Sequence, residues 1–361
     1  MAGLRSRKIM TRVAVLAAVL FAGTSQALEE LPEDELSSIS GAGIAIALDD
    51  FRFAMAPTSY IELTGTNTAL ANWDRGDVRY YGLTFSAASG PGETWYGNAC
   101  SGDLSCPIGT NAVANFAPVV NPYVARVFQY QGYDFQGNLV SPTVFELIGP
   151  SQSDDWRFAF WGEIQSDRGG ANDATLQSQT IINGKPITAD GRPAVLQLMQ
   201  VADTADPTFG IVYESALSGD FRFSVAQDGG EPANGNQEVP AFDPQEGLYF
   251  RNVDAYLPLG RLHHQALVLD STPANDGNFV IELTRLPDVP AVYNDYYADA
   301  SAAGYVRWGT FDMSIAGNSQ TNGLYFIEPV AAGGAVVNLG TSRIEGIQMQ
   351  HLKITSLDAG P

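Results

Sequence analysis

Apolar side chains recur at every second position in most hydrophobic segments of this sequence. The alternation is clear in residues 156–161, 221–225, 279–284 and 305–311, where aromatic and β-branched residues are frequent. A period of two residues is typical of β-strands, because successive side chains of a strand point to opposite faces of the sheet. These segments therefore predict strands that each have one buried face.

Turn-forming dipeptides separate the alternating segments. Asn183-Gly184, Asp190-Gly191 and Asn322-Gly323 are examples, and such pairs favour tight turns between strands. The spacing predicts roughly 15 to 20 short strands, and no apolar period of 3.6 residues predicts a helix beyond the N-terminal leader. We therefore predict an all-β fold, an antiparallel β-sandwich or jelly roll rather than a parallel sheet with crossover helices.

One segment has the composition of a linker. Residues 227–238 are rich in Gly, Asn, Gln and acidic residues and contain Pro232, a composition that favours a loop. We therefore expect two packed β domains, an N-terminal one over residues 28–238 and a C-terminal one over residues 239–361.

The first 27 residues have the three parts of a secretory signal peptide. A basic start at Arg5, Arg7, Lys8 and Arg12 precedes the apolar run 13–23, and small residues end at Ala27. This order predicts export and cleavage between Ala27 and Leu28. The alternative is a retained anchor, but the apolar run is about half the roughly 20 residues that a membrane-spanning helix needs. No later segment is long and apolar enough to form such a helix, so we expect a periplasmic, outer-membrane-surface or extracellular protein without a transmembrane span.

The chain is acidic. Its formal net charge of −21 becomes −25 when the four basic leader residues are removed, and only Lys185 and Lys353 remain as lysines. Such a surface repels phosphate backbones and anionic lipid head groups, so nucleic acid is not an expected partner. A saline habitat, calcium binding and simple solubility would each account for the acidity.

The two cysteines lie six residues apart. Cys100 and Cys106 flank a loop that contains Gly102 and two serines. A close pair outside the cytoplasm usually forms a disulfide, and two thiols without a nearby His are too few ligands for a zinc site. We predict a Cys100–Cys106 disulfide that closes a surface loop.

No motif of an established catalytic class occurs. The sequence lacks Gly-x-Ser-x-Gly, His-Glu-x-x-His and the Gly-rich phosphate loop. The three histidines are His263, His264 and His351, and adjacent residues of a strand point to opposite faces and cannot easily share one metal ion. Glu163 and Glu282 are the acids best placed for a glycosidase pair, but the separation that this chemistry requires cannot be obtained from sequence. The sequence therefore favours a protein that is not an enzyme and needs no cofactor other than, as an alternative, calcium.

Two loops carry oxygen ligands at short spacing, and calcium is the metal that they favour. One contains Asp203 and Asp206; the other contains Asn275, Asp276 and Asn278. Carboxylate and amide oxygens are typical calcium ligands, although turn formation alone also explains these residues.

Two short segments resemble a pilus-system family of Gram-negative exported proteins. Residues 31–46, LPEDELSSISGAGIAI, resemble the acidic Asp-Glu-Leu-Ser element and the Gly-x-Gly-Ile strand that open mature members of that family. Residues 344–354, IEGIQMQHLKI, resemble their β segments. The resemblance implies a cell-surface or fimbria-associated role with surface or pilus proteins as partners, and it implies no catalytic residues.

The leading hypothesis is an exported, non-enzymatic surface or pilus-associated protein with a structural or adhesive role. The first alternative is a secreted β protein that binds carbohydrate or hydrolyses glycosides, for which the tyrosines at 293, 296 and 297 could stack on sugars. The second alternative is an adhesin stabilised by calcium.

Overall fold

The strands are antiparallel throughout, which confirms the predicted all-β class. The computed structural model describes residues 43–56, 59–63, 78–87, 94–95, 98–99, 111–133, 138–166, 174–202, 207–228, 242, 245–261, 265–270, 280–298, 303–310 and 322–355. Within these ranges the strands alternate with turns, and the helical elements are α3 (Pro290–Ala298) and the short 3-10 helix η4 (Val330–Ala332).

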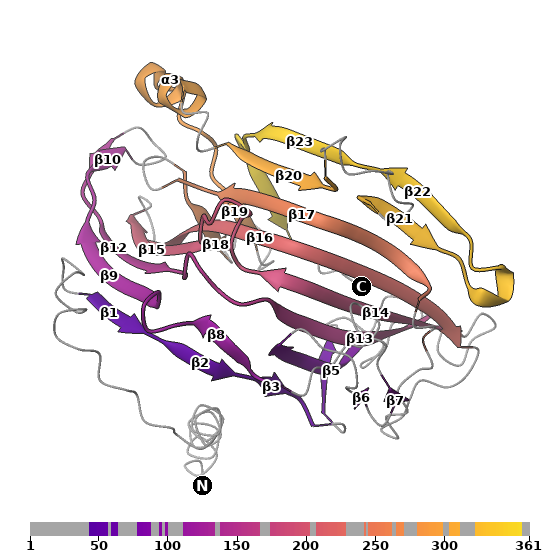
Figure 1. Cartoon of the computed structure of the whole chain (residues 1–361). Helices are drawn as coiled ribbons and strands as arrows, with labels where there is room; N and C mark the ends of the chain where they lie inside the picture. Colours follow the sequence, from indigo (N-terminus) through magenta and orange to yellow (C-terminus); the bar gives the residue numbers. More distant parts are fainter. Residues whose placement is uncertain are drawn as a thin grey trace, which may run out of the picture. The chain divides into compact units, whose positions relative to one another are not determined.

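The longest strand organises the main sheet. β16 (Pro207–Asp228) has 22 residues. Along one edge its first half pairs with β15 (Val195–Ala202) and its second half with β14 (Ala174–Lys185). Along its other edge it pairs with β18 (Leu267–Asp270) and β17 (Gly247–Leu259). Figure 1 shows β13, β14, β16 and β17 running side by side.

The remaining strands of the main sheet extend from these four neighbours of β16. From β14 the pairing continues through β13 (Trp156–Ser166) and β5 (Val78–Ala87) to β3 (Phe53–Ala54) and β4 (Tyr60–Leu63). From β15 it continues through β12 (Thr143–Ile148) and β9 (Tyr123–Gln129) to β1 (Gly43–Ile46). From β17 and β18 it reaches β20 (Gly304–Trp308), β23 (Ser342–Ile347), β21 (Leu324–Ile327), β22 (Val336–Gly340), β19 (Val280–Leu283) and β24 (Leu352–Thr355).

Three small two-stranded sheets accompany the main sheet. They are β2 (Leu48–Phe51) with β8 (Val113–Ala117), β6 (Thr94–Trp95) with β7 (Asn98–Ala99), and β10 (Gly132–Tyr133) with β11 (Leu139–Val140). The β2–β8 pair packs on the main sheet, where Phe116 and Val113 join a core cluster with Trp156 and Phe85. Two sheets thus share a core here, as the predicted sandwich requires.

The predicted domain boundary near residue 238 lies outside the described residues. The strands on either side of it belong to one sheet, because β16 and β17 are paired from Tyr213–Leu259 to Phe223–Leu248. Residues 41–361 also form one compact unit.

The prediction of a turn at Asn183-Gly184 was wrong. Both residues lie inside β14, where Gly184 faces Gly219 of β16. The two backbones approach so closely that a Cβ atom on Gly184 would lie 2.2 Å from the carbonyl oxygen of Ser218. Glycine is therefore needed here because the two strands lie close together, and not because the chain reverses direction. The predicted turn at Asp190-Gly191 is present, since the Gly191 amide donates to the Thr188 carbonyl over 2.9 Å.

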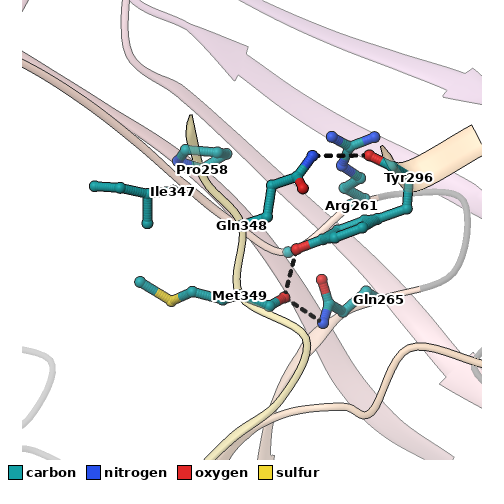
Figure 2. A pocket seen from close by; sticks show the side chains of 8 residues that line it. Pro258, Arg261, Gln265, Tyr296, Ile347, Gln348 and Met349 are labelled. Carbon is teal, nitrogen blue, oxygen red and sulfur yellow. Dashed lines mark hydrogen bonds between the residues drawn. The ribbon is translucent and has the colours of Figure 1, made fainter. Parts of the chain in front are cut away.

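The tyrosine-rich stretch forms a helix, although the sequence pattern predicted none outside the leader. α3 begins at Pro290, a residue favoured in the first helical turn. Its buried Tyr296 donates a hydrogen bond to the Met349 carbonyl over 2.8 Å, and Gln348 donates to the Tyr296 carbonyl over 2.9 Å. Figure 2 shows these contacts. Tertiary contacts of this kind stabilise a nine-residue helix that is too short to be stable alone.

Candidate functional site

The main sheet has two chemically different faces. The pairing registers connect alternate residues of each strand to alternate residues of its neighbours, so one face can be followed across the whole sheet. We call the face that carries Arg157, Trp161 and Glu163 of β13 the charged face. The opposite face, with Phe158, Phe160 and Ile164, is the apolar face.

Charged residues at paired positions of the main sheet all lie on the charged face. Arg222 and Arg157 are fully buried there, and Glu163 and Glu146 are nearly so. The other members follow from the same registers, and they include Glu62, Arg79, Arg126, Glu214, Asp254, Glu282, Arg307 and Glu345. Burial of ionic groups is costly unless partners compensate each one, so their contacts define what this face can do.

The same three-residue arrangement occurs twice on the charged face. In β5–β13–β14, Glu163 is in register with Arg79 on one side and Gln177 on the other. In β9–β12–β15, Glu146 is in register with Arg126 and Gln197 in the same way. We call these the two Arg-Glu-Gln ladders.

Hydrogen bonds satisfy the carboxylate in both ladders. Glu163 accepts from the Tyr81 hydroxyl over 3.1 Å and from the Gln177 amide over 3.2 Å. Glu146 accepts from Arg126 and from the Gln197 amide, each over 2.5 Å. Arg79 also donates to Glu62 over 3.2 Å. These carboxylates are held by neighbours on adjacent strands, an arrangement typical of structural support.

Aromatic rings on the charged face stack on one another. The Tyr81 and Trp161 rings are 4.2 Å apart between centroids with an interplanar angle of 12°, and the Tyr249 and Tyr325 rings are 4.8 Å apart at 6°. All four side chains are buried. Sugar binding by stacking needs an exposed ring face, which these four residues do not offer.

Raising the pH should destabilise the fold through Tyr81. Burial, together with the nearby Glu163 carboxylate, raises the pKa of Tyr81 to about 12, whereas an unfolded tyrosine titrates near 10. The neutral phenol therefore contributes about 2 to 3 kcal/mol that is fully present below pH 10 and is lost as the pH rises to 12. Urea unfolding at pH 9 and pH 12 measures this loss.

Y81F provides the control for the alkaline titration. It removes the Tyr81 share of the pH dependence, while Tyr256, whose pKa burial also raises, keeps its own share. An unchanged pH dependence in Y81F would contradict the assignment.

The apolar face leaves large hydrophobic side chains exposed. Ile44 of β1 is 68% exposed, and Ile164 and Leu176, which face each other on β13 and β14, are both 44% exposed. Other exposed members on this face are Ile46, Phe53, Ile61, Val127, Phe145, Tyr213, Val225, Leu269, Ile344, Leu352 and Ile354. This is the reverse of a water-soluble sheet, in which the exposed face is the polar one.

A groove lies in the apolar face across β4, β5, β13, β14 and β16. It has a volume of about 460 Å³, within the range of small-molecule sites. Its lining includes Ile61, Tyr80, Phe160, Ile164, Leu176 and Phe223, with the hydroxyls of Ser178 and Thr180 and without a charged group. The groove can hold an apolar group, and its lining contains no carboxylate, imidazole or thiol. Sequence analysis missed it, because alternation shows that a strand has an apolar side without showing whether that side is covered.

A second pocket, shown in Figure 2, is too small for a ligand. It lies between α3 and residues 347–349, and its volume of about 10 Å³ is about that of one water molecule. The Gln265 amide and the Tyr296 hydroxyl both donate to the Met349 carbonyl at its edge. These contacts fix the helix in place.

The two candidate acids are not brought together by strand pairing. Glu163 lies on β13, whose partners are β5 and β14, whereas Glu282 lies on β19, whose partners are β18 and β24. Glu282 is 3.0 Å from His351 and 3.7 Å from Lys353. Each glutamate thus has its own set of partners, and neither contacts the other through a shared strand.

The remaining predicted site residues lie outside the described part of the chain. They are Ala27 and Leu28 at the cleavage site, the two cysteines Cys100 and Cys106, and the calcium candidates Asp203, Asp206, Asn275, Asp276 and Asn278. The cleavage, the disulfide and the calcium loops therefore stay predictions.

The described ranges contain no group of three or more His, Cys, Asp or Glu side chains arranged to hold a metal ion. They also contain no helix that is long and apolar enough to cross a membrane.

No protein-family model, no curated protein and no solved structure matches this chain.

Proposed function

We propose that this chain is an exported, non-enzymatic protein of the cell surface, with a structural or adhesive role that includes association with pili. The observation that carries the proposal is the exposed apolar face of the main sheet. Contiguous exposed apolar surface on a folded protein marks a site of interaction with a partner or a membrane.

The charged face supports a structural role for its ionic groups. Glu163 and Glu146, the buried acids of the two ladders, each accept two hydrogen bonds from cross-strand neighbours. A general acid or base needs access to its substrate as well as a tuned pKa, and these two carboxylates are 2% and 5% exposed. These buried acids therefore favour a structural or binding role for the sheet over catalysis.

Cell fractionation tests the location that this function requires. The full chain with a C-terminal tag, expressed in a Gram-negative host, is expected in the envelope fraction with Leu28 as its first residue. Immunoblotting of the fractions for the tag measures the location, and N-terminal sequencing and mass spectrometry of the purified protein identify its first residue. Recovery from the cytoplasm with the leader intact would contradict the proposal, as would turnover of a glycoside by the purified protein.

A further inference from the structure

We propose that lipid acyl chains cover the apolar face of the main sheet. This inference rests on the proposed function only for its location at the cell envelope. It names the partner of the exposed face by its chemistry, which is hydrocarbon without charge or hydrogen-bonding groups. Three properties of the face favour that occupant over another protein: its width, its lack of charge, and the groove within it.

The first property is width. Residues in register form two apolar rows that each cross seven strands. One row contains Val127, Phe145, Leu198, Ile211, Leu267, Leu283 and Leu352. The other contains Phe53, Phe85, Phe158, Ile182, Phe221, Phe250 and Leu324.

Each row is roughly 29 Å long, because it spans six strand spacings of about 4.8 Å. The β2–β8 pair covers part of the second row, near Phe85 and Phe158. The first row includes Val127, Phe145 and Leu352, which are all exposed. A standard protein interface covers about 800 Å² per partner, a square of roughly 28 Å on each side. One row alone is as long as a side of that square, and the two rows cross β16 ten residues apart, at Ile211 and Phe221, which is roughly 33 Å along the strand. The apolar face therefore extends beyond the area of one such interface.

The second property is the separation of charge. The charged residues at paired positions of the sheet lie on the opposite face, and the two rows contain no hydroxyl, amide or ionic side chain. A protein interface usually includes about one hydrogen bond per 100–200 Å² and a polar rim. Hydrocarbon needs no such groups, so it matches two rows that provide none.

The third property is the groove at Ile164 and Leu176. Its volume of about 460 Å³ and its uncharged lining suit a flexible hydrocarbon chain. Leu176 and Ile164 are partly exposed on adjacent strands, so an occupant would remove both from water. The acidic surface elsewhere on the chain repels anionic head groups, so we expect attachment through the acyl chains.

Vesicle flotation tests this inference on the protein purified from the envelope fraction, without the apolar leader. Vesicles of phosphatidylethanolamine with a minority of phosphatidylglycerol are the probe. The wild-type protein is expected to float with the vesicles, and raising the salt to about 1 M should not release it, because apolar burial is not screened. The double variant I164N/L176N should lower the vesicle partition coefficient about tenfold to thirtyfold.

L139N is the matched control. Leu139 is 62% exposed but belongs to β11, outside the main sheet, so this variant should bind vesicles like the wild type. Circular dichroism of each variant establishes that the fold is retained.

Several outcomes would overturn the lipid inference. They are failure of the wild-type protein to float, release by salt, and equal losses in L139N and I164N/L176N. Concentration-dependent dimers that replace vesicle binding and are lost in I164N/L176N would assign the face to a second copy instead. In each of these cases an envelope location found by fractionation would leave the proposed function standing.

Discussion

Replacing Glu163 with alanine is expected to lower the free energy of unfolding by about 3 kcal/mol. The carboxylate is buried and accepts hydrogen bonds from Tyr81 and Gln177. Its removal leaves two buried donors without their acceptor, and each such group costs about 1–3 kcal/mol. Urea denaturation of E163A at pH 7 measures the loss.

Three variants distinguish the effect of disrupting the ladder from the general effect of losing a carboxylate on the free energy of unfolding. E146A removes the corresponding acid of the second ladder and should cost a similar amount. E345A removes an exposed acid that pairs with Arg307, and it should cost much less than E163A because solvent screens exposed ion pairs. E163L/Q177L replaces two partners by apolar groups and should recover part of the loss. Equal losses in E163A and E345A would refute a special role for the ladder.

Replacing Gly219 with alanine should be comparably destabilising, by about 3–4 kcal/mol. Gly219 has a φ of +145°, and an added Cβ atom would lie 2.2 Å from the Asn183 carbonyl oxygen. A positive φ of this size costs an L-residue about 1–3 kcal/mol, and the close contact forces β14 and β16 apart at a further cost of about 1–3 kcal/mol. The midpoint of urea unfolding measures the sum.

G334A measures the cost of a positive φ at a glycine that has no close neighbour. Gly334 has a φ of +63°, and an added Cβ atom there would meet nothing within 4 Å. We expect G334A to lose about 1 kcal/mol. If G219A were no worse than G334A, the close approach of the two strands would not matter to stability.

Much of the fold could be predicted from the sequence because alternation is a local property. The segments 156–161 and 221–225 became paired strands, as their period of two residues indicates. The position of Asn183-Gly184 inside a strand could not be predicted. The same dipeptide occurs where a chain reverses direction and where two strands lie close together. α3 was missed because its nine residues depend on contacts with Gln348 and Met349, more than 50 positions away.

The candidate site was only partly accessible from sequence. Glu163 was recognised as a candidate acid, but its Arg79 and Gln177 neighbours come from strands whose register is set by long-range pairing. The apolar groove unites residues from position 61 to position 223. Its volume depends on how five strands curve together, which local composition does not contain.

The sequence by itself determined that each strand has an apolar side and a polar side, because the side-chain period of a strand is two residues whatever surrounds it. The tertiary structure decided which side is covered. The sheet buries Arg157, Glu163 and Arg222 and leaves Ile164, Leu176 and Val225 exposed. The physical reason is that cross-strand partners satisfy the ionic groups only when the strands pair in this register, and the part of the apolar side that the β2–β8 pair does not cover then stays exposed.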